Sequence, residues 1–166
     1  YTFSRNQDAL YCSGALINNT ARDGRPLFLT AEHCVSSPQD ATSMVFYWNL
    51  QTSTCRTPGT PENGTQPDSL QPRRWEQTSS GAVLRARYGN DHRTNRIAGR
   101  PDLSLVEVDD ETTPRYDLFL SGWSRRSTAP SESVTIHHPA GHGKRISFDD
   151  DPARITAYGQ SSGGDT

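Results

Sequence analysis

The chain has 166 residues, enough for one domain or two small domains packed together. Its net charge of −2 comes from 17 basic and 19 acidic residues that are well mixed, which argues against an electrostatic nucleic-acid binder. Mean hydropathy is −0.80, and no apolar run approaches the ~18 residues that span a bilayer, so no membrane partner is expected. Because the chain begins at Tyr1 and shows no signal-peptide pattern, we expect a mature form or a fragment.

Short strands joined by turns are predicted along the whole chain, because Gly, Pro and small polar residues are frequent and no long stretch has a 3.6-residue period. Alternating or short continuous apolar runs predict strands at 11–17, 27–30, 44–48, 82–87 and 101–108, with hairpin-turn chemistry at 18–25. Long polar loops are predicted at 56–80 and 89–100. Shorter strands follow at 118–120, 122–123, 134–139, 144–148 and 155–158. The composition therefore favours an all-β fold.

A histidine and a carboxylate stand at the ends of two of these strands. His33 follows the apolar run 27–30 and directly precedes Cys34, so a strand delivers an imidazole to its end. Proton transfer near neutral pH needs such a tunable group on a rigid mount. Asp102 stands at the entrance of a later strand, where it could orient His33. Taken singly, His33 also fits a surface residue beside a structural disulfide, and Asp102 fits a turn-starting residue.

Three motifs, in this order, resemble those of chymotrypsin-like serine proteases. They are Cys12-Ser13-Gly14-Ala15-Leu16-Ile17, Thr30-Ala31-Glu32-His33-Cys34 and Asp102-Leu103-Ser104-Leu105-Val106. Gly14 in the first of them indicates a close approach of the backbone. Further segments resemble bacterial lysyl endopeptidases within that class: 18–20, 28–31, 45–49, 53–56, 122–126, 136–139 and 144–147. The resemblance covers about residues 11–158.

The resemblance implies an all-β, chymotrypsin-like double antiparallel β-barrel. The first barrel, residues 1–110, would be nearly complete and would carry the catalytic His33 and Asp102. Residues 111–118 would form a linker, and residues 119–166 a truncated second barrel. His33 would act as general base and then general acid, with Asp102 orienting it. Cys12 and Cys34 would form a disulfide worth about 3 kcal/mol on the chain-entropy model, and Cys55 would pair with a cysteine upstream of the region present.

The nucleophile of such an enzyme is not recognisable in this chain. Residues 160–164 superficially resemble the Asp-Ser-Gly-Gly motif, but only four residues follow Ser162, too few for the remaining strands of a barrel. Residues 156–159 better resemble a family segment that lies well before the nucleophile. We therefore expect the chain alone to be inactive and prone to associate. A missing C-terminal segment or a second chain would complete it.

A metal site formed by His138 and His142 is the alternative chemistry. The two histidines are four residues apart, as on a zinc-binding helix. Pro139, Gly141 and Gly143 disfavour a helix there, so a turn between two strands is predicted instead. We expect no metal and no cofactor.

The resemblance thus implies a secreted, trypsin-like serine endopeptidase that cleaves protein or peptide substrates, and it suggests a preference for Lys or Arg before the scissile bond. Tyr158 is a candidate for the aromatic wall of the substrate pocket, or else a packed core residue. Two other hypotheses remain open. The chain could be a protease-like binding module in which His33 and Asp102 are relics, or one chain of a two-chain protease.

Overall fold

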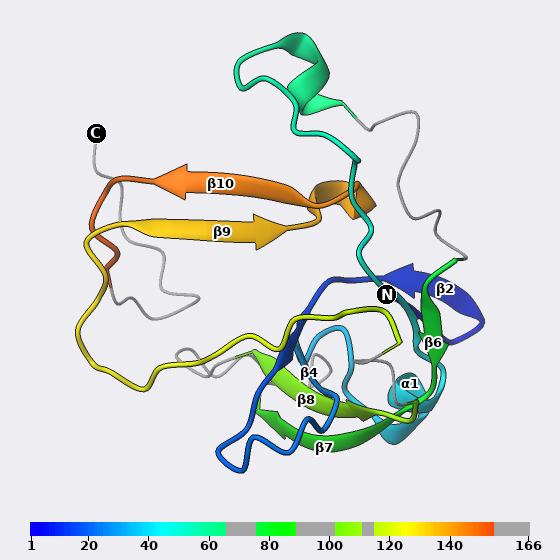
Figure 1. The fold of residues 1–166 in the computed structure, drawn as a ribbon. Helices are drawn as coiled ribbons and strands as arrows, with labels where there is room; N and C mark the ends of the chain where they lie inside the picture. Colours follow the sequence, from blue (N-terminus) through cyan, green and yellow to red (C-terminus); the bar gives the residue numbers. More distant parts are fainter. Residues whose placement is uncertain (66–75, 89–101, 111–114, 155–166) are drawn as a thin grey trace, which may run out of the picture.

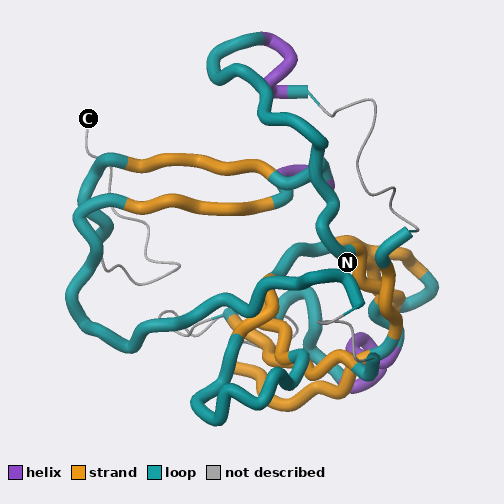
Figure 2. The backbone as a smooth tube through the Cα atoms, viewed as in Figure 1, coloured by secondary structure: helices purple, strands orange, loops and turns teal. Residues whose placement is uncertain are grey.

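The computed structural model describes residues 1–65, 76–88, 102–110 and 115–154, and nearly all of their regular structure is β (Figure 1). One short helix, α1 (Pro38–Thr42), and two 3₁₀ turns, η1 (Pro61–Gly64) and η2 (Pro139–Gly141), complete the elements of these ranges (Figure 2). All strand pairs within the sheets are antiparallel, so the predicted all-β, chymotrypsin-like class is confirmed. No helix in the described ranges is long and apolar enough to cross a membrane.

Two four-stranded sheets form the body of the molecule. The first has the order β2-β1-β5-β6 and consists of β1 (Thr2–Arg5), β2 (Asp8–Tyr11), β5 (Val45–Tyr47) and β6 (Thr78–Ser80). The second has the order β3-β4-β8-β7 and consists of β3 (Ala15–Ile17), β4 (Leu27–Thr30), β8 (Leu103–Val108) and β7 (Ala82–Tyr88). Strands distant in sequence are therefore neighbours in both sheets.

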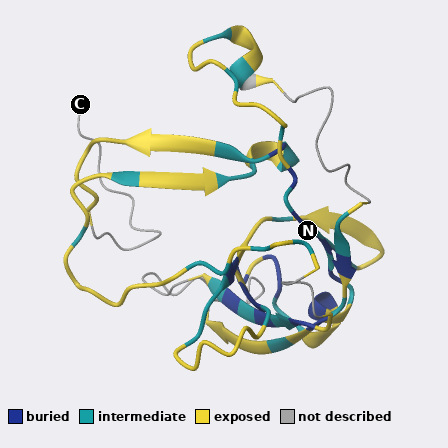
Figure 3. Ribbon diagram, viewed as in Figure 1, coloured by how far each residue is buried: buried dark blue, intermediate teal, exposed yellow. Residues whose placement is uncertain are grey.

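Aromatic side chains from both sheets meet in one core. The rings of Phe28 and Phe46 pack edge to face with centroids 5.0 Å apart, and Phe46 stacks on Trp48 at 5.2 Å. Phe28 comes from the second sheet and Phe46 from the first, so this cluster joins the two sheets. Figure 3 shows the buried residues concentrated within this body. The apolar area removed from water here is the main favourable term for folding.

A β-hairpin projects from this body (Figure 1). It pairs β9 (Ser133–His137) with β10 (Arg145–Asp149), and residues 138–144 form the turn that the sequence predicts. Ile136 lies opposite Ile146 and Val134 opposite Phe148, so all four side chains share one face of the hairpin. All four are more than half exposed, and Figure 3 shows most of the hairpin as exposed. Among the described residues, therefore, no further layer covers this apolar face of the hairpin.

The structure differs from the predicted elements in several places. The weakly patterned residues 1–10 contain β1 and β2, joined at Asn6 and Gln7 with φ of 52° and 72°, the left-handed pair of a tight hairpin turn. The predicted strand 11–17 is divided between β2 and β3. Strand β6 lies inside the predicted loop 56–80, and Ser121 forms only an isolated bridge with Ile17 where short strands were predicted. The predicted strand 155–158 falls outside the described residues, and the domain boundaries stay a prediction.

Gly14 lies where two strands approach closely, as the sequence predicts. A Cβ added at this position would come within 2.4 Å of both the Leu29 carbonyl oxygen and a Phe28 ring carbon. We predict that Gly14→Ala lowers the free energy of unfolding by about 1–3 kcal/mol, the usual cost of overpacking a core. Gly122→Ala is the matched control, because a Cβ there meets nothing within 4 Å. Urea unfolding of both variants measures the effect, and equal losses would contradict the steric argument.

Candidate active site

The pairing of β4 with β8 brings His33 and Asp102 to the same end of one sheet. Thr30 at the end of β4 lies opposite Ser104 near the start of β8. His33 follows Thr30 by three residues and Asp102 precedes Ser104 by two, so an antiparallel register places them together. The alternation of β8 buries Ser104 and Val106 and leaves Asp102 at the rim of the sheet.

Asp102 accepts two hydrogen bonds from His33. One carboxylate oxygen, Oδ2, lies 2.5 Å from the imidazole Nδ1, and the other, Oδ1, accepts the backbone N–H of His33 at 2.9 Å. Burial raises the pKa of Asp102, but the hydrogen bonds from the ring and backbone of His33 and from the Glu32 backbone outweigh it and lower the pKa. Asp102 is therefore ionised at neutral pH and fixes the ring orientation of His33.

Buried polar groups hold the loop that follows His33. The hydroxyl of Ser104 is fully buried and donates to the Val35 carbonyl oxygen at 2.6 Å. The carboxylate of Asp40, only 3% exposed, accepts the backbone N–H groups of Ser36 and Ser37, each at 3.0 Å. Ser37 in turn accepts the N–H of Asp40, which completes a capping box at the start of α1. The loop thus has a defined path after Cys34.

Arg5 provides the counter-charge of Asp40. Its Nε and Nη2 donate to the two carboxylate oxygens at 3.1 and 2.8 Å, a bidentate pair. Burial raises the pKa of Asp40, but the hydrogen bonds from Arg5, from the Ser36 backbone and from Ser37 outweigh it and lower the pKa from its ordinary 3.8 to about 2. This ion pair joins β1 to the segment that follows His33.

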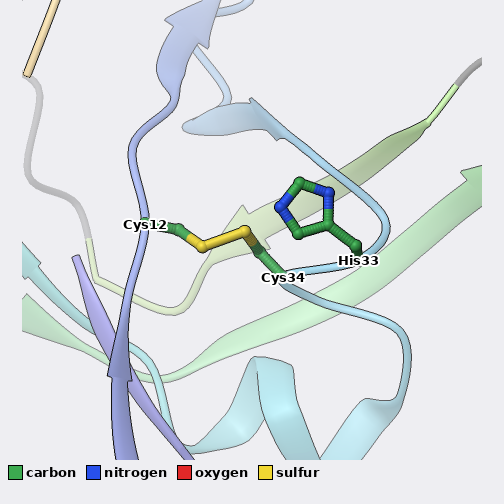
Figure 4. A group of neighbouring side chains, drawn as sticks. All are labelled: Cys12, His33 and Cys34. Carbon is green, nitrogen blue, oxygen red and sulfur yellow. A yellow bond between two sulfur atoms is a disulfide. The ribbon is translucent and has the colours of Figure 1, made fainter. Parts of the chain in front are cut away.

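A disulfide links Cys12 to Cys34, as the resemblance implies. It joins residues 22 positions apart and ties the segment before β3 to the residue after His33. Figure 4 shows the imidazole of His33 beside it, and the two sulfur atoms and a ring nitrogen lie within 4.8 Å of one another. A disulfide sulfur carries no thiolate charge, so only the imidazole of this group is a metal ligand in the oxidised protein. Cys55 is exposed and unpaired within the chain.

The other two candidate metal ligands, His138 and His142, lie in the turn between β9 and β10. The Nδ1–H of His138 donates to the His142 carbonyl oxygen at 3.0 Å, so this ring holds the turn closed. Burial lowers the pKa of His138. Both residues line a cavity of about 550 Å³ between the body and the hairpin, together with Tyr11, Tyr47 and Phe119. His33 and Asp102 do not line this cavity.

The structure brings together all four predicted site residues, His33, Asp102, Cys12 and Cys34. Tyr158, a candidate for the pocket wall, and Ser162, which is rejected as the nucleophile on sequence grounds, lie outside the described residues. The sequence patterns did not identify Arg5, Asp40 and Ser104 as residues that hold the loop after His33. The spacing of Ser37 and Asp40, with Pro38 between them, is a helix-start signal that would have found α1. No local signal pairs Arg5 with Asp40.

Ionised Asp40 is expected to stabilise the fold above the pH at which it titrates. Because its pKa is lower in the folded protein, the contribution is fully present above the unfolded value of ~3.9 and is lost as the pH falls through about 2. We predict that Asp40→Asn removes about 2 kcal/mol of the acid-dependent part of the free energy of unfolding. Urea unfolding between pH 6 and pH 2 measures this, with the exposed Asp150→Asn as control. Parallel pH curves for wild type and Asp40→Asn would contradict it.

The chain is similar to known proteins along nearly its whole length. A family model described as lysyl endopeptidase, C-terminal domain, matches residues 1–165. A lysyl endopeptidase of Pseudomonas aeruginosa is 28% identical over 167 aligned residues, which cover 100% of this chain and 31% of that protein. The chain thus spans about a third of the length of this curated relative. With nearly its whole length matched, the chain belongs to the lysyl endopeptidase family of protease-related proteins.

Proposed function

We propose that this chain is the histidine- and aspartate-bearing part of a serine endopeptidase. The observation that carries the proposal is the pair of hydrogen bonds from His33, one from Nδ1 and one from the backbone N–H, to the two oxygens of Asp102. This arrangement fixes the tautomer that leaves Nε2 to act as the base. It also compensates the positive charge that the ring acquires when it takes a proton.

In the proposed reaction His33 transfers protons and Asp102 stays ionised. Nε2 takes the proton of a serine hydroxyl as the serine oxygen attacks the scissile carbonyl carbon. The imidazolium then gives that proton to the departing amine nitrogen, the C–N bond breaks, and an acyl-enzyme ester remains. Water attacks the ester in the same way, with His33 as base and then as acid, and releases the acid product and the free serine hydroxyl. The lowered pKa of Asp102 supports its role as a permanent anion.

The serine and its oxyanion hole would come from residues that follow this chain or from a second chain. The exposed face of Val134, Ile136, Ile146 and Phe148 supports this, because a sheet face of this kind needs a packing partner. The relative that the chain matches is about three times as long, which leaves room for such a segment. We place the covering strands of a second barrel on this face.

Peptides and proteins with lysine or arginine before the scissile bond are the proposed substrates. The lysine preference is supported by the relative and the matching family, both of which are described as lysyl endopeptidases. The arginine preference rests on the trypsin-like resemblance of the motifs. The disulfide supports secretion, because such bonds persist in oxidising compartments. No cofactor takes part in the proposed chemistry, since the proton transfers need only side chains.

Labelling with a phosphonofluoridate tests the role of His33. In a protein that carries this chain together with its serine-bearing part, we predict that the serine is labelled in the wild type and not in His33→Ala. The reason is that a serine hydroxyl is a weak nucleophile unless a base takes its proton. Mass spectrometry of the labelled protein measures the effect. Undiminished labelling of His33→Ala would exclude the proposed base, and absence of labelling in the wild type would favour a binding module.

The role of Asp102 is tested in the same serine-bearing protein. We predict that Asp102→Asn retains the fold but lowers kcat on the order of ten-thousandfold, because an amide stabilises the wrong tautomer of the imidazole. Asp109→Asn, an exposed carboxylate after β8, is the matched control. Hydrolysis of a lysyl ester or amide substrate gives kcat, and a loss no larger than that of the control would contradict the role of Asp102.

A separate prediction tests whether a further segment of the complete protein covers the apolar face of the hairpin. Phe148 is 71% exposed in this chain. If a further segment covers it, Phe148→Ser should lower the free energy of unfolding of the complete protein by about 1.5–3 kcal/mol, the worth of a buried aromatic side chain. Ser147→Ala, on the opposite face of β10, is the control. Equal stabilities of the two variants would show that this face stays in water.

A further inference from the structure

We propose that Arg5 is a positioning residue for His33, and this inference rests on the proposed function. Its guanidinium holds the two carbonyl groups that follow the base in the chain. Nη1 donates to the His33 carbonyl oxygen at 3.1 Å, and Nη2 donates to the Cys34 carbonyl oxygen at 2.8 Å. None of these contacts involves the imidazole ring of His33.

The Asp40 carboxylate sets the orientation of Arg5. The bidentate pair fixes the plane of the guanidinium, and Nη2 also lies 3.3 Å from the Ser36 hydroxyl oxygen. Asp40 is itself nearly fully buried and holds the N-terminus of α1. Five hydrogen-bond donors in a rigid fork can satisfy the carboxylate and two carbonyl groups at once, which a lysine ammonium cannot do in one fixed geometry.

Hydrogen bonds to charged side chains then hold the peptide groups on both sides of His33. Asp102 accepts the N–H of His33, and Arg5 donates to its carbonyl oxygen. A change in the backbone dihedral angles of His33 would break one or both of these hydrogen bonds. Because the Nδ1–Oδ2 distance depends on where the Cα of His33 lies, the guanidinium acts on the imidazole through the backbone.

The hairpin of β1 and β2 positions Arg5 beside the loop that contains His33. Arg5 ends β1 directly before the tight turn at Asn6 and Gln7. The backbone N–H of Ser4 donates to the Ser43 hydroxyl at 3.0 Å, which ties β1 to the end of α1. The guanidinium also lies over the Phe3 ring, with 5.2 Å between its Cζ and the ring centroid. The position of Arg5 is therefore fixed by groups other than His33.

The test uses Arg5→Met and Arg5→Lys in the complete, serine-bearing protein. Arg25→Met is the control, because Arg25 also forms a bidentate pair with a carboxylate, that of Glu107, but contacts no part of the His33 loop. Three quantities are measured: kcat and KM on a lysyl substrate, the urea midpoint, and the downfield proton resonance of the His33 Nδ1–H. The resonance reports the hydrogen bond to Asp102 independently of activity.

We expect Arg5→Met to lower kcat on the order of tenfold with KM unchanged, and to speed the exchange of the Nδ1–H proton with water. Arg5→Lys keeps the charge opposite Asp40, so its urea midpoint should return toward wild type while the loss in kcat persists. Arg25→Met should change neither kcat nor the resonance. Arg5 variants that unfold more readily but keep the wild-type kcat and resonance would overturn the positioning role.

Failure of the proposed function has a different signature. If His33→Ala retains activity, the base is elsewhere, yet the Nδ1–H resonance still decides whether Arg5 positions His33. If His33→Ala is inactive and the Arg5 variants leave the resonance and kcat unchanged, the function stands and the role of Arg5 is excluded.

Discussion

The register between β4 and β8 is the constraint on which the site depends. Thr30 opposite Ser104 puts His33 and Asp102, which are 69 positions apart in the chain, within hydrogen-bond distance. A slip by one residue would turn Ser104 and Val106 away from the core and would move the Asp102 carboxylate away from His33. The packing that buries one face of the second sheet therefore also brings His33 and Asp102 together. A change in the register would disturb both the core and this pair.

The body of the molecule and the hairpin of β9 and β10 differ in how well their side chains are paired or buried. Around His33 the loop carbonyls accept hydrogen bonds from Arg5 and Ser104, and the carboxylates of Asp40 and Asp102 are paired. The hairpin of β9 and β10 instead presents large apolar side chains to water. A sheet face in this condition is costly on its own, whereas the hydrogen bonds that join His33 and Asp102 lie within the body. These hydrogen bonds hold His33, the proposed base, in place within this chain.

The sequence predicted those features that local patterns encode. The strands near His33 and Asp102 have apolar runs or alternation, and the motifs around Cys12, Cys34 and Gly14 are contiguous. The pattern did not predict β6, because Thr-Ser-Ser has no apolar side chain and pairs only through its neighbour β5. It also missed the pair of Arg5 and Asp40, since that contact spans 35 positions and depends on a turn in a polar segment. Such long-range polar pairs require the tertiary fold to be known.

The carboxylate of Asp40 compensates the positive charge that Arg5 brings close to the backbone of His33. A lone cation held against the backbone of His33 would oppose formation of an imidazolium, the form that the proposed reaction requires. Asp40 has its pKa lowered to about 2, so it stays ionised at neutral pH and offsets the charge of Arg5 at a distance of 2.8 Å. The guanidinium then supplies directional hydrogen bonds while its charge is paired with that of Asp40. Asp102 is left to accept the ring and backbone N–H groups of His33, and the two acidic residues thus hold different parts of the same loop.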